Sequence, residues 1–289
     1  LKPLRKGGGH QTNSIRLVDN SGRQYAMRSA KKSALRFIQY FLFKTEYLEA
    51  EVEETYFVQL LQDYWTTANP YGALTIADLA DAVGVLHPNP KLYYIPKQAA
   101  LGNYNDAYGN NIYFIEERLS DGQEDVASLG AGDKIINTLE LFGELRHKED
   151  VSIDEKLYIR TRIFDNLIGD WDRHADQWKW SETEDENGKM HYRPIPRDRD
   201  QVYSDFDGFI LGALTALTPP LRFMQRYDED YNHVKWYNDA GDDVDLAVLR
   251  NHKKEDWITE ARFIKANITE DIIEKAFSNL PPEIDQKKV

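Results

Sequence analysis

Acidic side chains gather at two points of the stretch from Asp165 to Gly208, and their types and spacing suggest chemistry. Several carboxylates that converge on one place repel one another unless a bound cation or a retained proton compensates for their charge. Oxygen ligands of this kind suit Mg²⁺ or Mn²⁺ bound together with a phosphate group. The stretch therefore predicts metal-assisted phosphate chemistry. The first group contains Asp170, Asp172, His174 and Asp176, and the second contains Asp198, Asp200, Asp205 and Asp207.

A β-hairpin is the element that would bring the two groups together. The segments 175–180 (ADQWKW) and 191–196 (HYRPIP) are apolar enough to form strands, and Glu-Asn-Gly-Lys at 186–189 is a strong turn signal. Because the outer ends of a hairpin meet, Asp172 and Asp198 are predicted to be near neighbours.

Two interpretations of this pair of carboxylates remain open. They form a metal–phosphate site, or they belong to a structural ion-pair network, since buried arginine–carboxylate pairs fix loops well. Under either interpretation Arg173 is predicted to be structural, and His174 is predicted to brace the loop rather than act as a base or metal ligand. The arginines of the network would be Arg173, Arg193, Arg197 and Arg199.

The composition describes an acidic globular protein. Its 289 residues are 41% hydrophobic and 12% aromatic, enough for a substantial core. The formal net charge of −13 argues against broad binding to nucleic acid or anionic membranes, which requires basic surfaces. The chain has no cysteine, which excludes thiolate sites, and no apolar run as long as a membrane span. The acidic segment 239–245 is predicted to be solvated surface.

The first part of the chain combines glycines with short strands. Three glycines at 7–9 precede predicted strands at 14–18 and 24–29, which a turn at 19–22 joins. A glycine loop lets backbone N–H groups approach a nucleotide phosphate, and Arg28 or Lys31 would supply positive charge. A flexible linker is the alternative interpretation of these glycines.

The order of elements predicts an α+β fold in two lobes. A strand-rich lobe at 1–120 is followed by a helical lobe at 121–289 that contains the hairpin of residues 165–208, and the boundary falls in the unperiodic polar segment 120–132. The predicted helices are 33–44, 47–66, 76–83, 133–146, 153–168, 209–217, 231–240, 245–250, 255–266 and 269–280, and the remaining strands are 91–96 and 111–119.

The loop at 169–174, Gly-Asp-Trp-Asp-Arg-His, resembles a motif of a known superfamily. It is similar to the Gly-Asn-x-Asp-Arg-His or Arg-Asn-x-Asp-Arg loops of atypical protein-kinase-like proteins. That group includes the HipA toxins, the spore-coat CotH kinases, the secretory-pathway kinases and the phosphatidylinositol 4-kinases. The resemblance implies a bilobal protein-kinase-like fold, with ATP and Mg²⁺ or Mn²⁺ as the expected cofactors.

A longer similarity covers nearly the whole chain up to about Gly208. Segments such as GGGHQTNSIRL, LADAVGVLHPNPKLYYIP, FIEERL and IGDWDRHADQW resemble a segment of bacterial proteins. There it accompanies a calcineurin-like metallophosphoesterase region and an outer-membrane surface-antigen barrel of the BamA/TamA type. This context implies linkage to such regions and an extracytoplasmic location, with the cytoplasm as the alternative.

The resemblance also implies roles for individual residues of the hairpin stretch. Asp172 matches the catalytic aspartate, which orients or deprotonates the acceptor hydroxyl. Asp198 matches the metal-binding aspartate, with Asp200 as the alternative. Gln177 stands where the superfamily has a metal-binding asparagine; it is longer by one methylene, and Mg²⁺ tolerates poor geometry badly.

Nucleotide-binding roles fall on the first part of the chain. Arg28 takes the place of the strand lysine that holds the phosphates, although a planar guanidinium is not equivalent to an ammonium group. Its carboxylate partner would lie on the second helix, where Glu53, Glu54 and Asp63 are candidates. The phosphate loop would be Gly7, Gly8 and Gly9, and the hinge that contacts adenine through its backbone would be Glu116, Glu117 and Arg118.

Three functions remain open. The first is phosphoryl transfer from ATP to a hydroxyl on a protein, lipid or small molecule, through positioning and charge neutralisation. The second is a pseudokinase or scaffold, favoured by the replacements at Gln177 and Arg28. The third is a metal-dependent phosphoesterase, against which the seven scattered histidines count. Its two metals would be held by Asp170, Asp172, His174 and Asp198.

Overall fold

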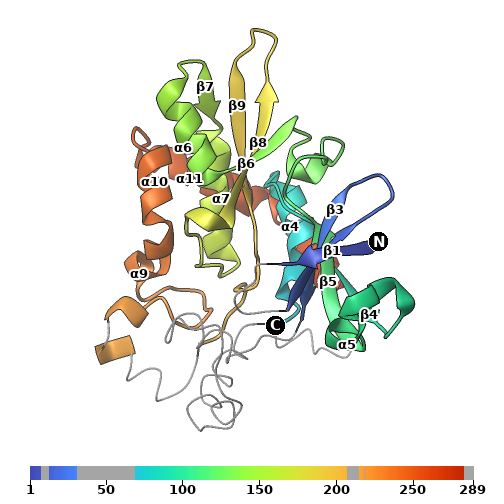
Figure 1. Ribbon diagram of the computed structural model, residues 1–289. Helices are drawn as coiled ribbons and strands as arrows, with labels where there is room; N and C mark the ends of the chain where they lie inside the picture. The colour runs from blue at the N-terminus through green and yellow to red at the C-terminus, as the bar shows by residue number, and fades with distance from the viewer. Residues whose placement is uncertain (8–12, 31–68, 207–214, 218, 283–289) are drawn as a thin grey trace. The chain divides into compact units, whose positions relative to one another are not determined.

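The computed structural model describes residues 1–7, 13–30, 69–206, 215–217 and 219–282 (Figure 1). The chain divides into two compact units, Leu1–Pro70 with Pro90–Arg118, and Tyr71–Asn89 with Leu119–Val289. The strands are β1 (Lys2–Lys6), β2 (Ser14–Val18), β3 (Gln24–Ser29), β4 (Lys91–Ile95), β5 (Asn111–Glu117), β6 (Lys134–Asn137), β7 (Val151–Ile153), β8 (Trp178–Glu184) and β9 (Met190–Pro196). The α-helices are α4 (Ile76–Val83), α5 (Asn105–Tyr108), α6 (Thr138–His147), α7 (Glu155–Leu167), α9 (Val234–Asn238), α10 (Asp242–Val248), α11 (Lys254–Asn267) and α12 (Glu270–Phe277).

The first unit is built on a five-stranded antiparallel sheet in the order β1-β2-β3-β5-β4. Side-chain alternation buries Ile15 of β2 and Met27 of β3 on one face, where they share a core with Tyr113 of β5. The carboxylate of Asp19 fixes the turn between β2 and β3 by accepting the backbone N–H groups two and four residues on. The strands predicted at 14–18 and 24–29 are confirmed.

Strand β1 is absent from the sequence prediction. It pairs antiparallel with β2 at the edge of the sheet, and nearly all its side chains are exposed. An edge strand without a buried face shows no hydrophobic alternation, and Pro3 is tolerated there because no central ladder is broken.

The second unit contains a four-stranded sheet in the order β6-β8-β9-β7, in which β8 and β9 form the predicted hairpin. Its first strand begins three residues later than predicted, because Ala175–Gln177 form a 3₁₀ turn, and it extends to Glu184. Trp178 and Trp180 of β8 and Tyr192 of β9 are fully buried and pack with Leu141 of α6 and Tyr158 of α7. Because a one-residue slip would turn these large aromatic side chains towards solvent, their burial fixes the register of the hairpin.

The segment predicted as a helix at 133–146 is in fact a strand followed by a helix. Residues Lys134–Asn137 form β6, which pairs antiparallel with β8. Asn137 then begins α6 through a capping box with Glu140. In the same way β7 precedes α7, and Asp154 caps that helix. Strands of three or four residues are too short for a period-two pattern, which is why the sequence prediction missed them.

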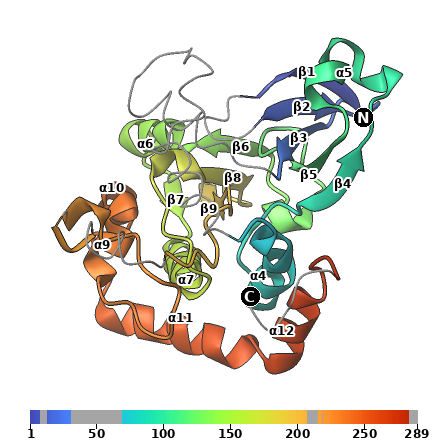
Figure 2. The same cartoon turned by 90° about the horizontal axis from the view of Figure 1, so that it is seen from below.

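Four helices of the second unit share a further core. Leu79 of α4, Phe164 of α7, Ile264 of α11 and Ala276 of α12 are all buried in it. Helix α11 packs against α7, and α12 packs against α4, next to which it lies in Figure 2. Helix α4 has the predicted bounds, and α7, α11 and α12 lie close to theirs. This packing fixes the position of α7, whose last turn leads into the acidic loop.

The α+β class expected of a bilobal protein-kinase-like fold is confirmed: a strand-rich unit is joined to a mainly helical one that holds the hairpin. The segment Tyr71–Asn89 groups with the helical unit. Among the described residues, no helix is long and apolar enough to cross a membrane. The predicted helices at 33–44 and 47–66, and most of the one at 209–217, lie outside the described residues.

His252 forms a pH-dependent link between α7 and α11, which allows a test of this packing. His252 ion-pairs with Glu155 of α7 and with Asp256 of α11, and the hydrogen bond to Glu155 raises the pKa of His252 above 6.5. Its contribution is complete below the unfolded pKa and is lost as pH rises through the higher folded pKa. We expect His252→Gln to lower the free energy of unfolding more at about pH 6 than at about pH 9.

Urea unfolding at both pH values measures this difference. His233→Gln is the matched control, because His233 is exposed and its side chain makes no capping hydrogen bond. An equal loss of stability at both pH values for His252→Gln would contradict the charged link.

Candidate functional site

The outer end of the β8–β9 hairpin brings together the segments that carry the predicted residues. Beyond the last ladder pair, Trp178 and Pro196, the N–H of Arg197 donates to the carbonyl of Gln177 at 3.0 Å. Asp198 therefore follows directly on a residue that is hydrogen-bonded to the end of the acidic loop. The outer ends of the hairpin thus meet at Gln177 and Arg197, while the proximity of Asp172 and Asp198 stays a prediction.

Gly169 opens the loop at the point where α7 ends. Its φ is 74°, and a Cβ there would lie 2.8 Å from the ring of Tyr227, so the position requires glycine. The N–H of the next residue, Asp170, donates back to the carbonyl of Asp165 at 2.8 Å. The chain thus turns sharply out of the helix.

Hydrogen bonds to its carbonyl groups hold the rest of the loop. The indole Nε1 of Trp178 donates to the carbonyl of Arg173 at 3.1 Å, and the hydroxyl of Thr138 donates to the carbonyl of Ala175 at 2.7 Å. Both donors belong to packed elements, so the loop is positioned by the core of the unit.

Asp172 is the exception within this fixed loop. Its side chain is half-buried, with 24% exposed, and no described residue donates a hydrogen bond to its carboxylate. Its ion-pair contact is the Nε2 of His174 at 3.8 Å. The Nδ1 of His174 accepts the N–H of Asp176 at 3.3 Å, so this histidine braces the loop as predicted. The Asp172 carboxylate keeps its capacity to accept hydrogen bonds.

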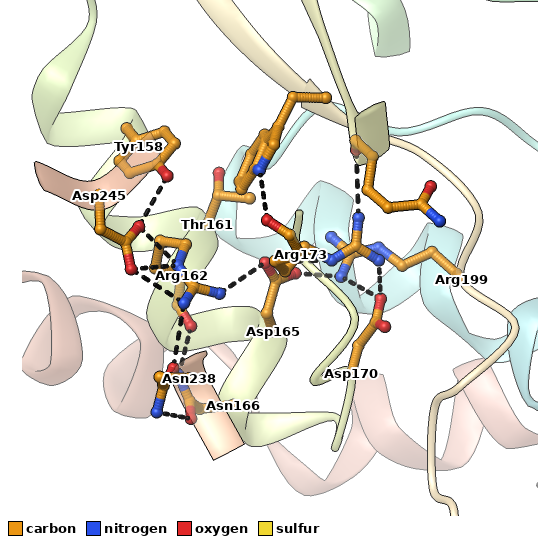
Figure 3. A network of polar contacts seen from close by, with 12 residues as sticks. Tyr158, Thr161, Arg162, Asp165, Asn166, Asp170, Arg173, Arg199, Asn238 and Asp245 are labelled. Carbon is orange, nitrogen blue, oxygen red and sulfur yellow. Dashed lines mark hydrogen bonds and ion pairs between the residues drawn. The ribbon is translucent and has the colours of Figure 1, made fainter. Parts of the chain in front are cut away.

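Two aspartates and two arginines form a buried ion-pair cluster (Figure 3). Asp165 comes from the last turn of α7, Asp170 and Arg173 from the loop, and Arg199 from the segment after β9. Arg173 and Arg199 both bind the Oδ2 of Asp170, and Arg199 also binds Asp165. The four side chains are at most 5% exposed, so these are charge-assisted hydrogen bonds in a dry environment.

Arg173 joins this cluster to the hairpin. Its Nη1 donates to the carbonyl of Arg197 at 2.8 Å and to that of Gln177 at 3.3 Å. The same guanidinium group therefore neutralises Asp170 and closes the end of the hairpin. The structural role predicted for Arg173 is confirmed.

Arg162 of α7 extends the cluster towards α10. It binds both carboxylate oxygens of Asp245 and lies 3.8 Å from Asp165. The hydroxyl of Tyr158 donates to Asp245 as well, at 2.7 Å. The prediction that residues 239–245 are solvated surface is therefore wrong for Asp245, since that carboxylate compensates a buried arginine.

Burial shifts the pKa of the Asp170 carboxyl group. It raises the pKa of this carboxyl from 3.8 to about 6, while the charges of Arg173 and Arg199 limit the rise. Its Oδ1 is buried without a hydrogen-bond donor among the described residues. Asp170 remains mainly ionised at neutral pH and holds its two arginines.

The ion pairs of these arginines show which of the acidic residues belong to the structural network. Arg173 and Arg199 pair with Asp165 and Asp170, which form the structural network, whereas Asp172 stays outside it. The sequence prediction gave Asp165 no role. A signal was present: Asp165 lies in the last turn of α7, where the helix dipole disfavours a carboxylate unless a cation compensates for it.

The predicted metal ligands lie on both sides of the hairpin end. Gln177, Asp198 and Asp200 are half-buried, and Asp198 has a left-handed backbone with a φ of 58°. No group of three or more His, Asp or Glu side chains in the described part of the chain is arranged to hold a metal ion. These oxygen donors fit Mg²⁺ or Mn²⁺ that completes its shell with phosphate and water rather than with protein ligands alone.

In the first unit, Gly7 lies close to β2. Its N–H donates to the carbonyl of Ser14 at 2.9 Å, and a Cβ would lie 2.1 Å from the Ser14 hydroxyl oxygen, so only glycine fits there. Gly8 and Gly9 lie outside the described residues.

Arg28 of β3 ion-pairs with Glu116 of β5 at 3.3 Å. The register pairs Ala26 with Glu116, so Arg28 and Glu116 are diagonal neighbours on one face of the sheet. The structure therefore gives Arg28 a carboxylate partner on a strand. The three candidates on the predicted second helix, Glu53, Glu54 and Asp63, lie outside the described residues.

The predicted hinge continues β5. The N–H of Arg118 donates to the carbonyl of Gln24 at 3.0 Å, and its guanidinium group donates to the Gln24 side chain. Antiparallel pairs alternate between hydrogen-bonded and non-hydrogen-bonded residues, so the N–H and C=O of Glu117 point away from β3.

The backbone of Asp198 generates a prediction about stability. A left-handed conformation costs a non-glycine residue about 1–2 kcal/mol, a cost that glycine avoids. We expect Asp198→Gly to be more stable than Asp198→Ala, with the free energy of unfolding measured in urea. At Asp176, in a 3₁₀ turn of the same loop, the order should reverse. Alanine as the more stable substitution at both positions would contradict the left-handed assignment.

No protein-family model and no curated protein matches the chain. Among solved structures, it is similar to the Helicobacter pylori proinflammatory kinase CtkA, with 12% identity and a TM-score of 0.45 over 99% of this chain and 87% of that one. It is similar to HipA of a Shewanella oneidensis toxin–antitoxin system, with 10% identity and a TM-score of 0.42 over 99% of this chain and 61% of that one. The Rio2 kinase of Chaetomium thermophilum, in a complex with ADP, Mg²⁺ and phosphoaspartate, has 12% identity and a TM-score of 0.34 over 92% of this chain and 72% of that one. These likenesses are distant and assign no activity to the chain.

Proposed function

We propose that this chain is an atypical kinase-like phosphotransferase, which uses ATP and a divalent cation to phosphorylate a hydroxyl group. The state of Asp172 supports the proposal best: its loop is held by buried ion pairs and hydrogen bonds, while its own carboxylate accepts no hydrogen bond from a described residue. A fixed carboxylate with free acceptor capacity is suited to orient a hydroxyl nucleophile and to accept its proton.

The proposed reaction transfers the γ-phosphate of ATP to the acceptor hydroxyl. The acceptor oxygen forms a bond to the γ-phosphorus, the bond to the β–γ bridging oxygen breaks, and the hydroxyl proton passes to Asp172. A divalent cation at Asp198 and Gln177, with Asp200 as the alternative ligand, would neutralise phosphate charge when bound. ATP would be held by Gly7, Gly8, Gly9 and Arg28, and by the backbone of Glu116, Glu117 and Arg118.

A second candidate is a nucleotide-binding regulatory domain without turnover. The ion pair between Arg28 and Glu116 favours it, because a guanidinium group already paired within the sheet is less available to a phosphate. Gln177 at the metal position favours it as well. A two-metal phosphoesterase is disfavoured because Asp170, one of its four expected ligands, is held by Arg173 and Arg199 in the buried ion-pair cluster. Linkage to a membrane barrel or a phosphoesterase region, and an extracytoplasmic location, stay predictions from the sequence resemblance.

Replacing the acceptor carboxylate tests the proposal. Asp172→Asn removes the proton acceptor and keeps the volume of the side chain, so we expect transfer of γ-phosphate to fall by about 10²-fold or more. The measurement is autophosphorylation and phosphate release with radiolabelled ATP and Mg²⁺ or Mn²⁺. Asp176→Asn is the control, because Asp176 is an exposed carboxylate of the same loop.

Calorimetric titration with ATP separates the candidates. Metal-dependent binding with transfer that Asp172→Asn abolishes supports the phosphotransferase. Binding without any transfer by the unmodified protein would replace it by the regulatory domain. Equal transfer by the Asp172→Asn and Asp176→Asn variants would refute the role of Asp172.

A further inference from the structure

Asp198 has a left-handed backbone, a conformation that residues other than glycine adopt uncommonly, although aspartate tolerates it better than most. With a φ of 58° it lies in the left-handed region, which costs a non-glycine residue about 1–2 kcal/mol. Such a residue persists only where the surrounding structure determines its conformation. The side chain of Asp198 therefore takes its direction from whatever fixes the backbone on either side.

The preceding residue is fixed through its backbone. The N–H of Arg197 donates to the carbonyl of Gln177 at 3.0 Å. The carbonyl of Arg197 accepts a hydrogen bond from the Nη1 of Arg173 at 2.8 Å. The chain therefore enters Asp198 from a position that is set by the hairpin and by Arg173.

The following residue is fixed through its side chain. Arg199 is 5% exposed and binds the carboxylates of Asp165 and Asp170, and its guanidinium carbon lies 5.5 Å from the centre of the Phe164 ring. The Nη1 of this buried guanidinium group contacts both carboxylates, so the end of the Arg199 side chain is fixed in position. The chain therefore leaves Asp198 towards an anchor that cannot move without breaking the ion-pair cluster.

We propose that Arg199 is a positioning residue for the divalent cation: through Asp165 and Asp170 it keeps Asp198 in its left-handed conformation and so directs the Asp198 carboxylate to the metal. The identity of the ligand, a hard divalent cation, rests on the proposed function. The role of Arg199 is separate from it, because Arg199 acts on the metal ligand and not on the acceptor or the nucleotide.

Manganese binding to the whole chain, followed by electron paramagnetic resonance without nucleotide and again with a non-hydrolysable ATP analogue, tests this role. Arg199→Lys keeps the charge, but its ammonium group sits on a different stem and does not reproduce the position of the Nη1 that contacts both carboxylates. We expect the dissociation constant for Mn²⁺ to rise by about 10–100-fold, the usual effect of losing a group that orients a metal ligand. Asp165→Asn, of equal volume, weakens the same anchor from the other side and should give the same direction of change. Arg193→Lys is the control, because the guanidinium group of Arg193 makes, among the described residues, one long hydrogen bond of 3.5 Å, to the carbonyl of Gly130.

Thermal melting shows whether each variant is folded at the temperature of the titration. Folded Arg199→Lys and Asp165→Asn variants that bind Mn²⁺ within about twofold of the unmodified protein, a change too small for a lost orienting group, would overturn the inference. So would Mn²⁺ binding by the unmodified protein that Asp198→Asn leaves unchanged. Absent phosphate transfer, with Mn²⁺ binding that still depends on Arg199, would refute the phosphotransferase and uphold the positioning role.

Discussion

Two carboxylates that cannot remain buried without partners determine how the second unit is organised. Removing Asp165 and Asp170 from water costs several kcal/mol each unless opposite charges and hydrogen bonds compensate. The compensation comes from Arg173, in the loop after α7, and from Arg199, after β9. Charge neutrality in the interior therefore requires the end of the helix, the loop and the hairpin exit to meet.

Because of this need for charge neutrality, neighbouring residues have different roles: some hold the loop, and others keep an accessible carboxylate. Asp170 and Arg173 are fully buried and hold the loop, whereas Asp172, between them in the sequence, keeps a half-exposed carboxylate. On the other arm, Arg199 is buried and Asp198 beside it is half-buried. The stable network and the residues proposed for chemistry thus alternate along the chain, and the rigid members set the geometry of the reactive ones.

Local sequence patterns predicted much of the fold, and the elements that they missed form through long-range pairing. The strands at 14–18 and 24–29 and helix α4 have clear periodicity and are where the sequence places them. The hairpin forms as its turn signal predicts, but its first strand is Trp178–Glu184 rather than 175–180. β6 and β7 are too short for such a pattern.

In the candidate site, too, local motifs were predictable from the sequence and long-range pairs were not. The loop at 169–174 indicates Asp172 by its motif. The pairing of Arg162 with Asp245 spans 83 residues, and that of Arg28 with Glu116 depends on strand register, so composition and spacing could predict neither.

A double-mutant cycle on Asp170→Asn and Arg173→Met, with free energies of unfolding from urea titration, tests the buried cluster most directly. Each single substitution leaves an uncompensated charge and should cost about 3–5 kcal/mol, while the double variant should cost less than the sum by about 2 kcal/mol or more. Additive costs would contradict the cluster as the interaction on which the unit depends.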